Sequence, residues 1–140
     1  MVITRATEYS IRAMLHLASK YPAPVITKTE ICRDEEITPA FLAKIIQPLI
    51  KKGLVVSKRG VAGGFALAKP PSQITLLDVM HAVEEPLSLN VCLSSDQGCD
   101  RSPECPVHDI WTDVRNYIEN KFGNKTLAEL VEEKCRKVVA

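Results

Sequence analysis

The spacing of apolar residues predicts that the chain begins with two helices. Thr27 and Glu30 have the spacing of a capping box, in which each side chain satisfies a free amide of the first turn, and they predict a short helix over about residues 27–33. A turn at residues 34–36 should follow it. Before it, a first helix is expected over about residues 4–20, because apolar residues recur there at helical spacing: Ile11, Met14, Leu15 and Ala18.

The third predicted helix separates apolar residues from polar ones. Thr38 should cap it and Pro39 should occupy its first position, where a missing N–H is harmless. Pro48 should bend its last turn because it removes a helical hydrogen bond, and Gly53 should end it. The buried stripe is expected to hold Phe41, Leu42, Ile45, Ile46, Leu49 and Ile50. The opposite face is expected to present Ala40, Lys44, Gln47 and Lys51.

Two short apolar runs, 54–57 and 65–68, flank a basic, glycine-rich segment, which predicts a β-hairpin with Arg59 near its tip. Three helices and a basic hairpin are the parts of a winged helix-turn-helix domain. In such a domain the third helix enters the major groove of DNA and the hairpin touches the backbone or the minor groove. The alternatives are a core helix with a solvated face and a hairpin that merely connects two elements.

Three further helices are expected after the hairpin. Thr75 and Asp78 should cap a helix over about 75–84, with Leu77, Met80 and Val83 directed inward. Pro106 should begin a long helix, and a final helix of about eight residues should follow Thr126. The long helix carries an apolar stripe that is either intramolecular core or, more in keeping with a small DNA-binding chain, the seam of a homodimer: Val107, Ile110, Trp111, Val114, Ile118 and Phe122.

Charge is distributed unevenly along the chain, whose formal net charge is +1. Residues 1–80 carry 11 Lys and Arg against 6 Asp and Glu, whereas residues 81–140 carry 7 against 11. No acidic residue occurs between Ile37 and Leu77, so this part of the chain should attract a phosphate backbone, although a solvated basic face is the alternative. No apolar run approaches the ~18 residues of a membrane span and no secretory signal is visible, so a cytoplasmic protein without a membrane partner is expected.

Four potential metal ligands lie between residues 92 and 108 in a polar, turn-forming stretch: Cys92, Cys99, Cys105 and His108. Three thiols and an imidazole could hold an iron–sulfur cluster or a zinc ion. The gaps between these cysteines are wider than those of most structural zinc sites, which favours the cluster. An odd number of cysteines, 5, in a chain expected in the cytosol disfavours structural disulfides and leaves a thiol switch as an alternative.

Two other classes of function would use part of this pattern. A cysteine–histidine enzyme would need a residue that orients the histidine, and the sequence specifies none. An iron–sulfur electron carrier would explain the cysteines alone. Because either class leaves the basic hairpin without a role, a DNA-binding regulator is favoured over both, and no catalytic residue is predicted.

Several motifs occur together with the three-cysteine loop: Ile37-Thr38-x-x-Phe41-Leu42-x-x-Ile45, Gly53-Leu54-Val55, Arg59-Gly60-x-x-Gly63-Gly64-Phe65-x-Leu67 and Ile74-x-Leu76-Leu77-Asp78-Val79. In this combination, over about residues 3–122, the chain resembles the winged-helix regulators of the IscR and NsrR type. The resemblance implies a dimeric bacterial transcription regulator that binds operator DNA. It also implies an iron–sulfur cluster held by the three cysteines, as in many members of that family.

The resemblance offers two candidates for the fourth cluster ligand. The run from Cys105 to Trp111 is similar to that of the IscR type, in which the histidine, here His108, completes a two-iron cluster. Glu8 lies about where the NsrR type uses a carboxylate from the partner subunit; otherwise it is a first-turn acid that complements the helix dipole. His108 with a [2Fe–2S] cluster is the expected pair. A [4Fe–4S] cluster stays open, because the first cysteine gap is one residue longer than is usual in IscR-type loops.

The sequence therefore predicts a mainly α-helical fold with a small β-hairpin wing: a winged helix-turn-helix plus a long dimerisation helix. Its parts should be a DNA-binding domain at 1–84, a cluster-binding loop at 85–105, and the dimerisation and C-terminal helices at 106–140. Two copies should pair through the helix at about 106–122. Double-stranded operator DNA should be contacted by Lys28, Thr38, Pro39, Ala40, Lys44, Gln47, Lys51, Lys58, Arg59 and Gly60.

Overall fold

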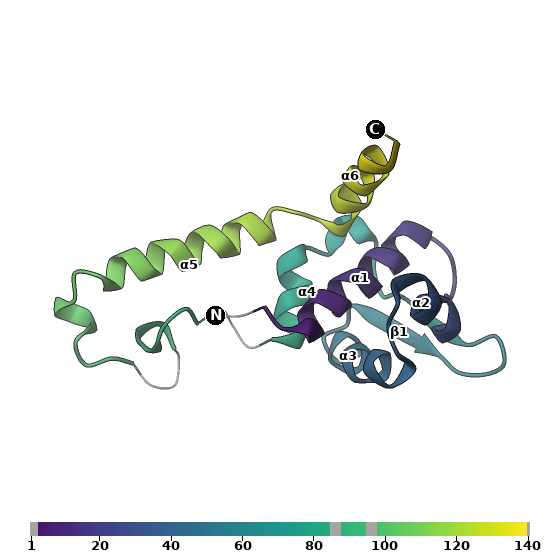
Figure 1. Cartoon of the computed structure of the whole chain (residues 1–140), viewed down its shortest axis with the longest axis horizontal. Helices are drawn as coiled ribbons and strands as arrows, with labels where there is room; N and C mark the ends of the chain where they lie inside the picture. Colours follow the sequence, from purple (N-terminus) through teal and green to yellow (C-terminus); the bar gives the residue numbers. More distant parts are fainter. Residues whose placement is uncertain (1–2, 85–87, 95–97, 140) are drawn as a thin grey trace.

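A computed structural model describes residues 3–84, 88–94 and 98–139. These residues form helices and one two-stranded antiparallel sheet (Figure 1). The α-helices are α1 (Arg5–Lys20), α2 (Lys28–Glu35), α3 (Pro39–Lys51), α4 (Leu76–Val83), α5 (His108–Gly123) and α6 (Leu127–Val139). The strands are β1 (Val55–Lys58) and β2 (Gly64–Leu67), and short 3-10 turns are η1 (Pro71–Gln73), η2 (Val91–Leu93) and η3 (Ser102–Glu104).

The hydrophobic core forms around α1, which packs against α2, α3, α4 and α6. Its largest fully buried apolar side chains come from five of the helices and the segments between them: Met14, Ile31, Leu42, Ile45, Ile46, Leu49, Val55, Ile74, Val79 and Leu127. Figure 1 shows α5 running outward from this body, with the cysteine-containing segment folded back beneath it. None of the helices in the described residues has the length and apolarity needed to cross a bilayer.

Helices α2 and α3 form the predicted helix-turn-helix. Thr27 and Thr38 cap them, each accepting a hydrogen bond from the amide three residues later, at 3.2 and 3.3 Å. The predicted turn at residues 34–36 is wrong in detail, because α2 continues through Glu35 and only Glu36 is left-handed, at φ 54°. The side chain of Glu30 does not complete the predicted capping box, since it faces His16 and Lys20 of α1 instead.

The wing forms as predicted and gains a third backbone partner. Val55 pairs with Leu67, and Lys58 with Gly64. Ile26, which precedes α2, exchanges two backbone hydrogen bonds of 2.8 Å with Phe65 and so holds β2 from its other side. A Cβ on Gly64 would lie 2.1 Å from the Ile26 carbonyl oxygen, so this close approach requires glycine.

The predicted stripe of α3 is confirmed at its centre. Leu42, Ile45, Ile46 and Leu49 are buried, whereas Phe41 and Ile50 at the edges are half-buried. Helix α3 continues through Pro48 to Lys51. In α4 the predicted inward set is confirmed at Met80, which is buried, and at Val83, which is half-buried against the core. Leu77 is half-buried, and the prediction missed Val79, which is fully buried.

Helices α5 and α6 differ from the prediction at their ends. Helix α5 begins at His108 instead of Pro106, because the first helical hydrogen bond runs from the Trp111 amide to the Val107 carbonyl, at 3.1 Å. Helix α6 has 13 residues, not about eight, and its last turn carries Arg136 and Lys137, whose charges suit a helix C-terminus.

The C-terminal helix returns to the winged body. The Leu76 amide donates to the Lys125 carbonyl and the Leu127 amide to the Ile74 carbonyl, each at 2.8 Å. Leu127 is fully buried, and Leu130 and Val131 pack against the core. The segment between α5 and α6 is therefore fastened by backbone hydrogen bonds to the start of α4.

Candidate nucleic-acid interface and cysteine loop

One face of α3 is free of acidic residues and open to solvent. Its exposed side chains include all those predicted to face DNA: Thr38, Pro39, Ala40, Lys44, Gln47 and Lys51. The face exists because the apolar stripe on the other side of α3 packs into the core. An exposed cationic helix beside a wing matches the major groove of B-DNA, which admits one helix.

The tip of the wing is exposed and cationic. Lys58, Arg59 and Gly60 are all exposed, and Gly60 has a φ of +115°, a conformation that side chains beyond glycine rarely adopt. Gly63 closes the turn, because a Cβ there would lie 2.3 Å from the Lys58 carbonyl oxygen. The glycines thus present two cations at the tip of a narrow hairpin, and Figure 1 shows the hairpin loop reaching beyond the helices.

A groove lies between α2 and the start of α3. It is lined by Lys28, Thr29, Cys32, Arg33 and Pro39. Two of these residues, Thr29 and Arg33, are not among those predicted from the sequence to contact DNA.

The cysteine loop is built from short turns. Cys92 lies in η2 and Cys105 directly follows η3, while the Ser102 amide donates to the Cys99 carbonyl at 3.0 Å. All three thiols are unpaired and half-buried. Within the described part of the chain, no three of the ligand atoms of these cysteines and His108 lie within 4.8 Å of one another.

His108 is placed next to Cys105. Its amide donates to the Cys105 carbonyl at 3.1 Å, and its Nδ1 is buried without a hydrogen-bond partner among the described residues. No side chain caps the start of α5. The first turn of α5 therefore combines a free imidazole nitrogen with the positive end of a helix dipole, three residues after Cys105.

Glu8 forms an ion pair with Arg12 on the surface of α1. Its Oε1 accepts a 3.0 Å hydrogen bond from Arg12, one turn along the helix, and the Glu8 side chain is 56% exposed. Arg12 in turn lies over the Tyr9 ring, 5.1 Å from its centroid. Within one chain, Glu8 therefore forms a surface ion pair.

The first half of the apolar stripe of α5 is exposed in a single chain, whereas Ile118 and Phe122 further along are half-buried. No residue of α5 is buried, and Val107, Ile110, Trp111 and Val114 are 37–58% exposed. The helix contacts η2 of the cysteine loop and α4 of the winged body. It therefore touches both the loop and the helix-turn-helix domain while leaving the first half of its apolar stripe exposed.

Glu84 connects the end of α4 to the start of α1. It is the last residue of the first described segment, and its carboxylate accepts hydrogen bonds from the hydroxyl groups of Thr4 and Thr7. These hydrogen bonds, that of Thr4 first, hold the pKa of the Glu84 carboxyl below its usual value. The chain thus enters the cysteine loop from a fixed point.

Replacing Glu84 with Gln should lower the free energy of unfolding by on the order of 1 kcal/mol at neutral pH, because hydrogen bonds to a charged acceptor are stronger. Since the folded-state pKa is depressed, this contribution is present above the unfolded pKa and is lost as the pH falls through the folded pKa. Urea unfolding at pH 7 and at decreasing pH measures the difference. The exposed Glu132→Gln is the control; a Glu84→Gln deficit that stays constant with pH would contradict the assignment.

Comparison with known proteins agrees with this arrangement. Residues 3–133 match the Rrf2 family model, described as an iron-dependent transcriptional regulator. The HTH-type transcriptional regulator IscR of Serratia proteamaculans is 33% identical over 140 residues, which is 100% of this chain and 85% of that protein. Among solved structures, CymR, the global cysteine regulator of B. subtilis, has a TM-score of 0.78 at 25% identity, covering 95% of this chain and 98% of that one.

A second solved structure, T. potens IscR, has a TM-score of 0.76 at 24% identity and covers 96% of this chain and 88% of that one. Its likeness supports the winged-helix fold, which the order of α1–α3, the hairpin and the two C-terminal helices already shows. The fold, the motifs and the length of the match together settle the family. The chain belongs to the Rrf2 family of winged-helix, DNA-binding transcriptional regulators.

Proposed function

We propose that this regulator is a homodimer whose affinity for operator DNA is controlled by an iron–sulfur cluster, held by Cys92, Cys99, Cys105 and a fourth ligand, His108. The observation that carries the proposal is the position of α5. It contacts both the cysteine loop and α4, the segment that follows it is hydrogen-bonded to α4, and the first half of its apolar stripe is exposed. A change in the loop can therefore reach both the subunit seam and the DNA-binding domain.

The residues of the loop suit a cluster. The three half-buried thiols are unpaired, and the buried Nδ1 of His108 lacks a partner in the described residues. No side chain caps the start of α5, so its first backbone N–H groups carry partial positive charge at the end of the helix that follows Cys105. This charge favours a negatively charged cluster bound to the cysteine thiolates. Such a cluster, when bound, would supply a redox-active centre whose potential depends on its ligands.

The two candidates for the fourth ligand differ in their surroundings. His108 lies three residues from Cys105 and has a free ring nitrogen, whereas the Glu8 carboxylate is paired with Arg12. These differences support His108, and histidine ligation favours a [2Fe–2S] cluster. A [4Fe–4S] cluster with Glu8 supplied by the partner subunit is the alternative assignment.

A thiol switch without a cluster is the second candidate function. It is supported by the likeness to CymR, whose solved structure bears the name of a cysteine regulator. Cys92, Cys99 and Cys105 would then act through their own oxidation, without iron. The absence of bound iron and colour after anaerobic preparation distinguishes this alternative, and bound zinc without colour would mark a zinc-containing regulator.

The proposed dimer forms through α5. Exposed apolar patches on a regulator of this size mark interaction surfaces, and a two-fold pair of α5 helices would cover both stripes. Two winged domains would then face DNA together, so that the operator would consist of two half-sites. Within each half-site, α3 enters the major groove and the wing lies against the backbone or minor groove.

In this proposed docking of α3 and the wing on DNA, each exposed residue of the predicted set has a role. Lys44 and Gln47 point from the outer face of α3 toward base edges, and Arg59 at the wing tip reaches the minor groove. Lys28, Lys51 and Lys58 contact phosphates, while Thr38, Pro39, Ala40 and Gly60 bring the backbone close to the duplex. All of these residues are exposed, and all except Lys28 lie in the stretch between Ile37 and Leu77 that contains no acidic residue.

Replacing Lys44 or Arg59 with Ala should weaken binding to a duplex that the protein has selected from a random library. Losing one phosphate contact should reduce the slope of log affinity against log salt by about 0.9. Losing a bidentate base contact should cost roughly 1–3 kcal/mol at one base position. Fluorescence anisotropy across a salt series measures both effects.

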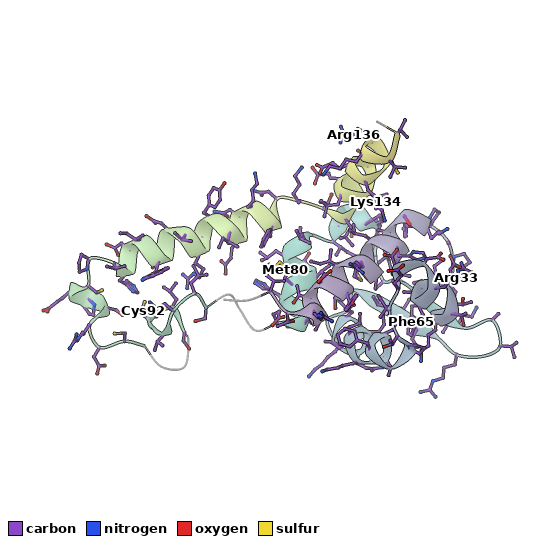
Figure 2. All side chains as sticks on the ribbon, in the orientation of Figure 1. Arg33, Phe65, Met80, Cys92, Lys134 and Arg136 are labelled. Atoms are coloured by element: carbon purple, nitrogen blue, oxygen red, sulfur yellow. The ribbon has the colours of Figure 1, made fainter. Side chains whose placement is uncertain are left out.

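The matched control is Lys134→Ala, which removes a cation from the exposed surface of α6, away from the wing (Figure 2). It should leave both affinity and salt slope unchanged. If Lys44→Ala and Arg59→Ala behave like this control, the docking through α3 and the wing is wrong.

A further inference from the structure

A histidine of α1 and acidic residues of α2 meet in a cluster that the proposed function does not use. His16 is only 6% exposed, although histidine is often found at the surface. Ligand atoms of His16, Glu30 and Asp34 all lie within 4.8 Å of one another. These three residues, called the α1–α2 cluster below, are separate from the cysteine loop, which Figure 2 shows at the other end of the molecule from Arg33 of α2.

The two ring nitrogens of His16 have different surroundings. Nδ1 lies 3.0 Å from Glu35 Oε1, and because a carboxylate can only accept, Nδ1 carries the proton of the neutral ring. In that neutral form Nε2 holds the lone pair that a metal ion needs, and this atom is buried without a hydrogen-bond partner among the described residues. A carboxylate that orients a histidine in this way is the arrangement found behind metal-bound histidines.

The free nitrogen faces a carboxylate at a metal-binding spacing. His16 Nε2 lies 3.5 Å from Glu30 Oε1. Two ligands of a tetrahedral zinc ion, each about 2.1 Å from the metal, lie about 3.4 Å apart. The pair therefore already has the separation that a shared ion requires. A carboxylate oxygen of Asp34 lies within 4.8 Å of a ligand atom of each, and a rotation of the Asp34 side chain would bring it to the same ion.

The neighbouring cations leave the cluster accessible. Lys20 Nζ lies 3.8 Å from the same Glu30 oxygen, and Arg33 Nε donates to Asp34 Oδ1 at 2.6 Å. The Lys20 and Arg33 side chains are 48% and 70% exposed, so either can turn to solvent when a divalent ion takes its place.

We infer that His16 Nε2, Glu30 and Asp34 bind a divalent transition-metal ion between α1 and α2, for which zinc is the best match. One imidazole nitrogen and two carboxylate oxygens form a ligand set that zinc accepts, with water completing the tetrahedron. Glu35 acts as a positioning residue for His16. The bound ion would join α1 to the first helix of the helix-turn-helix and stabilise the folded state by mass action.

Calorimetric titration of the full chain with zinc chloride tests this site. The parent for the test carries Cys92→Ser, Cys99→Ser and Cys105→Ser, which removes the loop thiols as competing ligands without touching the buried core. We expect about one zinc per chain, with Glu30→Gln and Asp34→Asn each weakening affinity at least about tenfold. Zinc should also raise the melting temperature of this parent and not that of the two variants.

Glu132→Gln, which removes one exposed carboxylate from α6, is the matched control and should bind zinc as the parent does. Glu30 and Asp34 lie at the surface end of the cluster, so their amide variants keep the fold, and circular dichroism checks this. The inference is overturned if the parent binds no zinc at micromolar concentration, or if Glu30→Gln and Asp34→Asn bind it as tightly as the control. Neither result depends on the cysteine loop or on DNA.

Discussion

Replacing Val114 and Ile118 of α5 with Glu should convert the protein from a dimer to a monomer. Val114 is 40% exposed, and no residue of α5 is buried in the single chain. In a paired seam the four introduced carboxylates of a dimer would lose water and repel one another, at a cost of several kcal/mol. Sedimentation at micromolar concentration measures the change.

The matched control places the same charges on the other side of the helix. Asn116 and Asn120 are exposed and lie two residues beyond the replaced pair, about 200° around α5. Asn116→Glu with Asn120→Glu should therefore remain dimeric. A wild-type chain that sediments as a monomer under these conditions would rule out the α5 seam.

Each of the single changes Cys92→Ser, Cys99→Ser and Cys105→Ser should abolish iron retention, because each leaves only two of the three thiolates to bind the cluster. Iron and sulfide content after anaerobic purification, together with the absorption spectrum, measures the loss. The control is Cys135→Ser, which removes an exposed thiol from α6 and should leave the iron content unchanged. A loop variant that retains the wild-type amount of iron would remove its cysteine from the ligand set.

The same preparation distinguishes the candidates for the fourth ligand. His108→Ala should alter the cluster spectrum and lower iron content, whereas Glu8→Ala should only break the surface pair with Arg12. A Mössbauer spectrum of the wild type identifies a two-iron or a four-iron cluster. If Glu8→Ala changes the spectrum and His108→Ala does not, the carboxylate of the partner subunit is the ligand.

Local patterns were sufficient to predict most of the winged domain. Apolar spacing located the centre of α3, and Thr38, Thr75 and Thr126 each accept a hydrogen bond from the third amide along, as their sequence context indicated. These features depend on residues within four positions of one another. The glycine-rich hairpin was predictable for the same reason, since its turn and its strands are adjacent in the sequence.

Contacts between distant residues could not be predicted in this way. Ile26 joins β2 through its backbone alone, and a single paired residue leaves no periodic signal. His16 and Glu35 come from different helices, so their pairing depends on how α1 packs against α2. The full length of α6 was missed because its C-terminal half is exposed and carries no apolar stripe. The cysteines were identifiable by residue type and spacing, but their arrangement around a cluster was not.

We propose that the state of the cysteine loop controls the affinity for DNA through α5. Helix α5 contacts the loop at η2 and is joined through residues 124–127 to α4. Coupling between two such sites typically amounts to 1–3 kcal/mol, which is about a 5- to 150-fold change in affinity. A chain that binds iron and DNA independently would show no such change.

The most direct test measures affinity for one selected duplex by anisotropy, under anaerobic conditions, for the cluster-loaded protein and for the same preparation after its iron is removed by a chelator. The Cys92→Ser variant, treated identically, controls for the chelator. We predict that removing the cluster changes wild-type affinity at least about fivefold and leaves that of the variant unchanged. Equal affinities of the loaded and cluster-free wild-type protein would contradict the account.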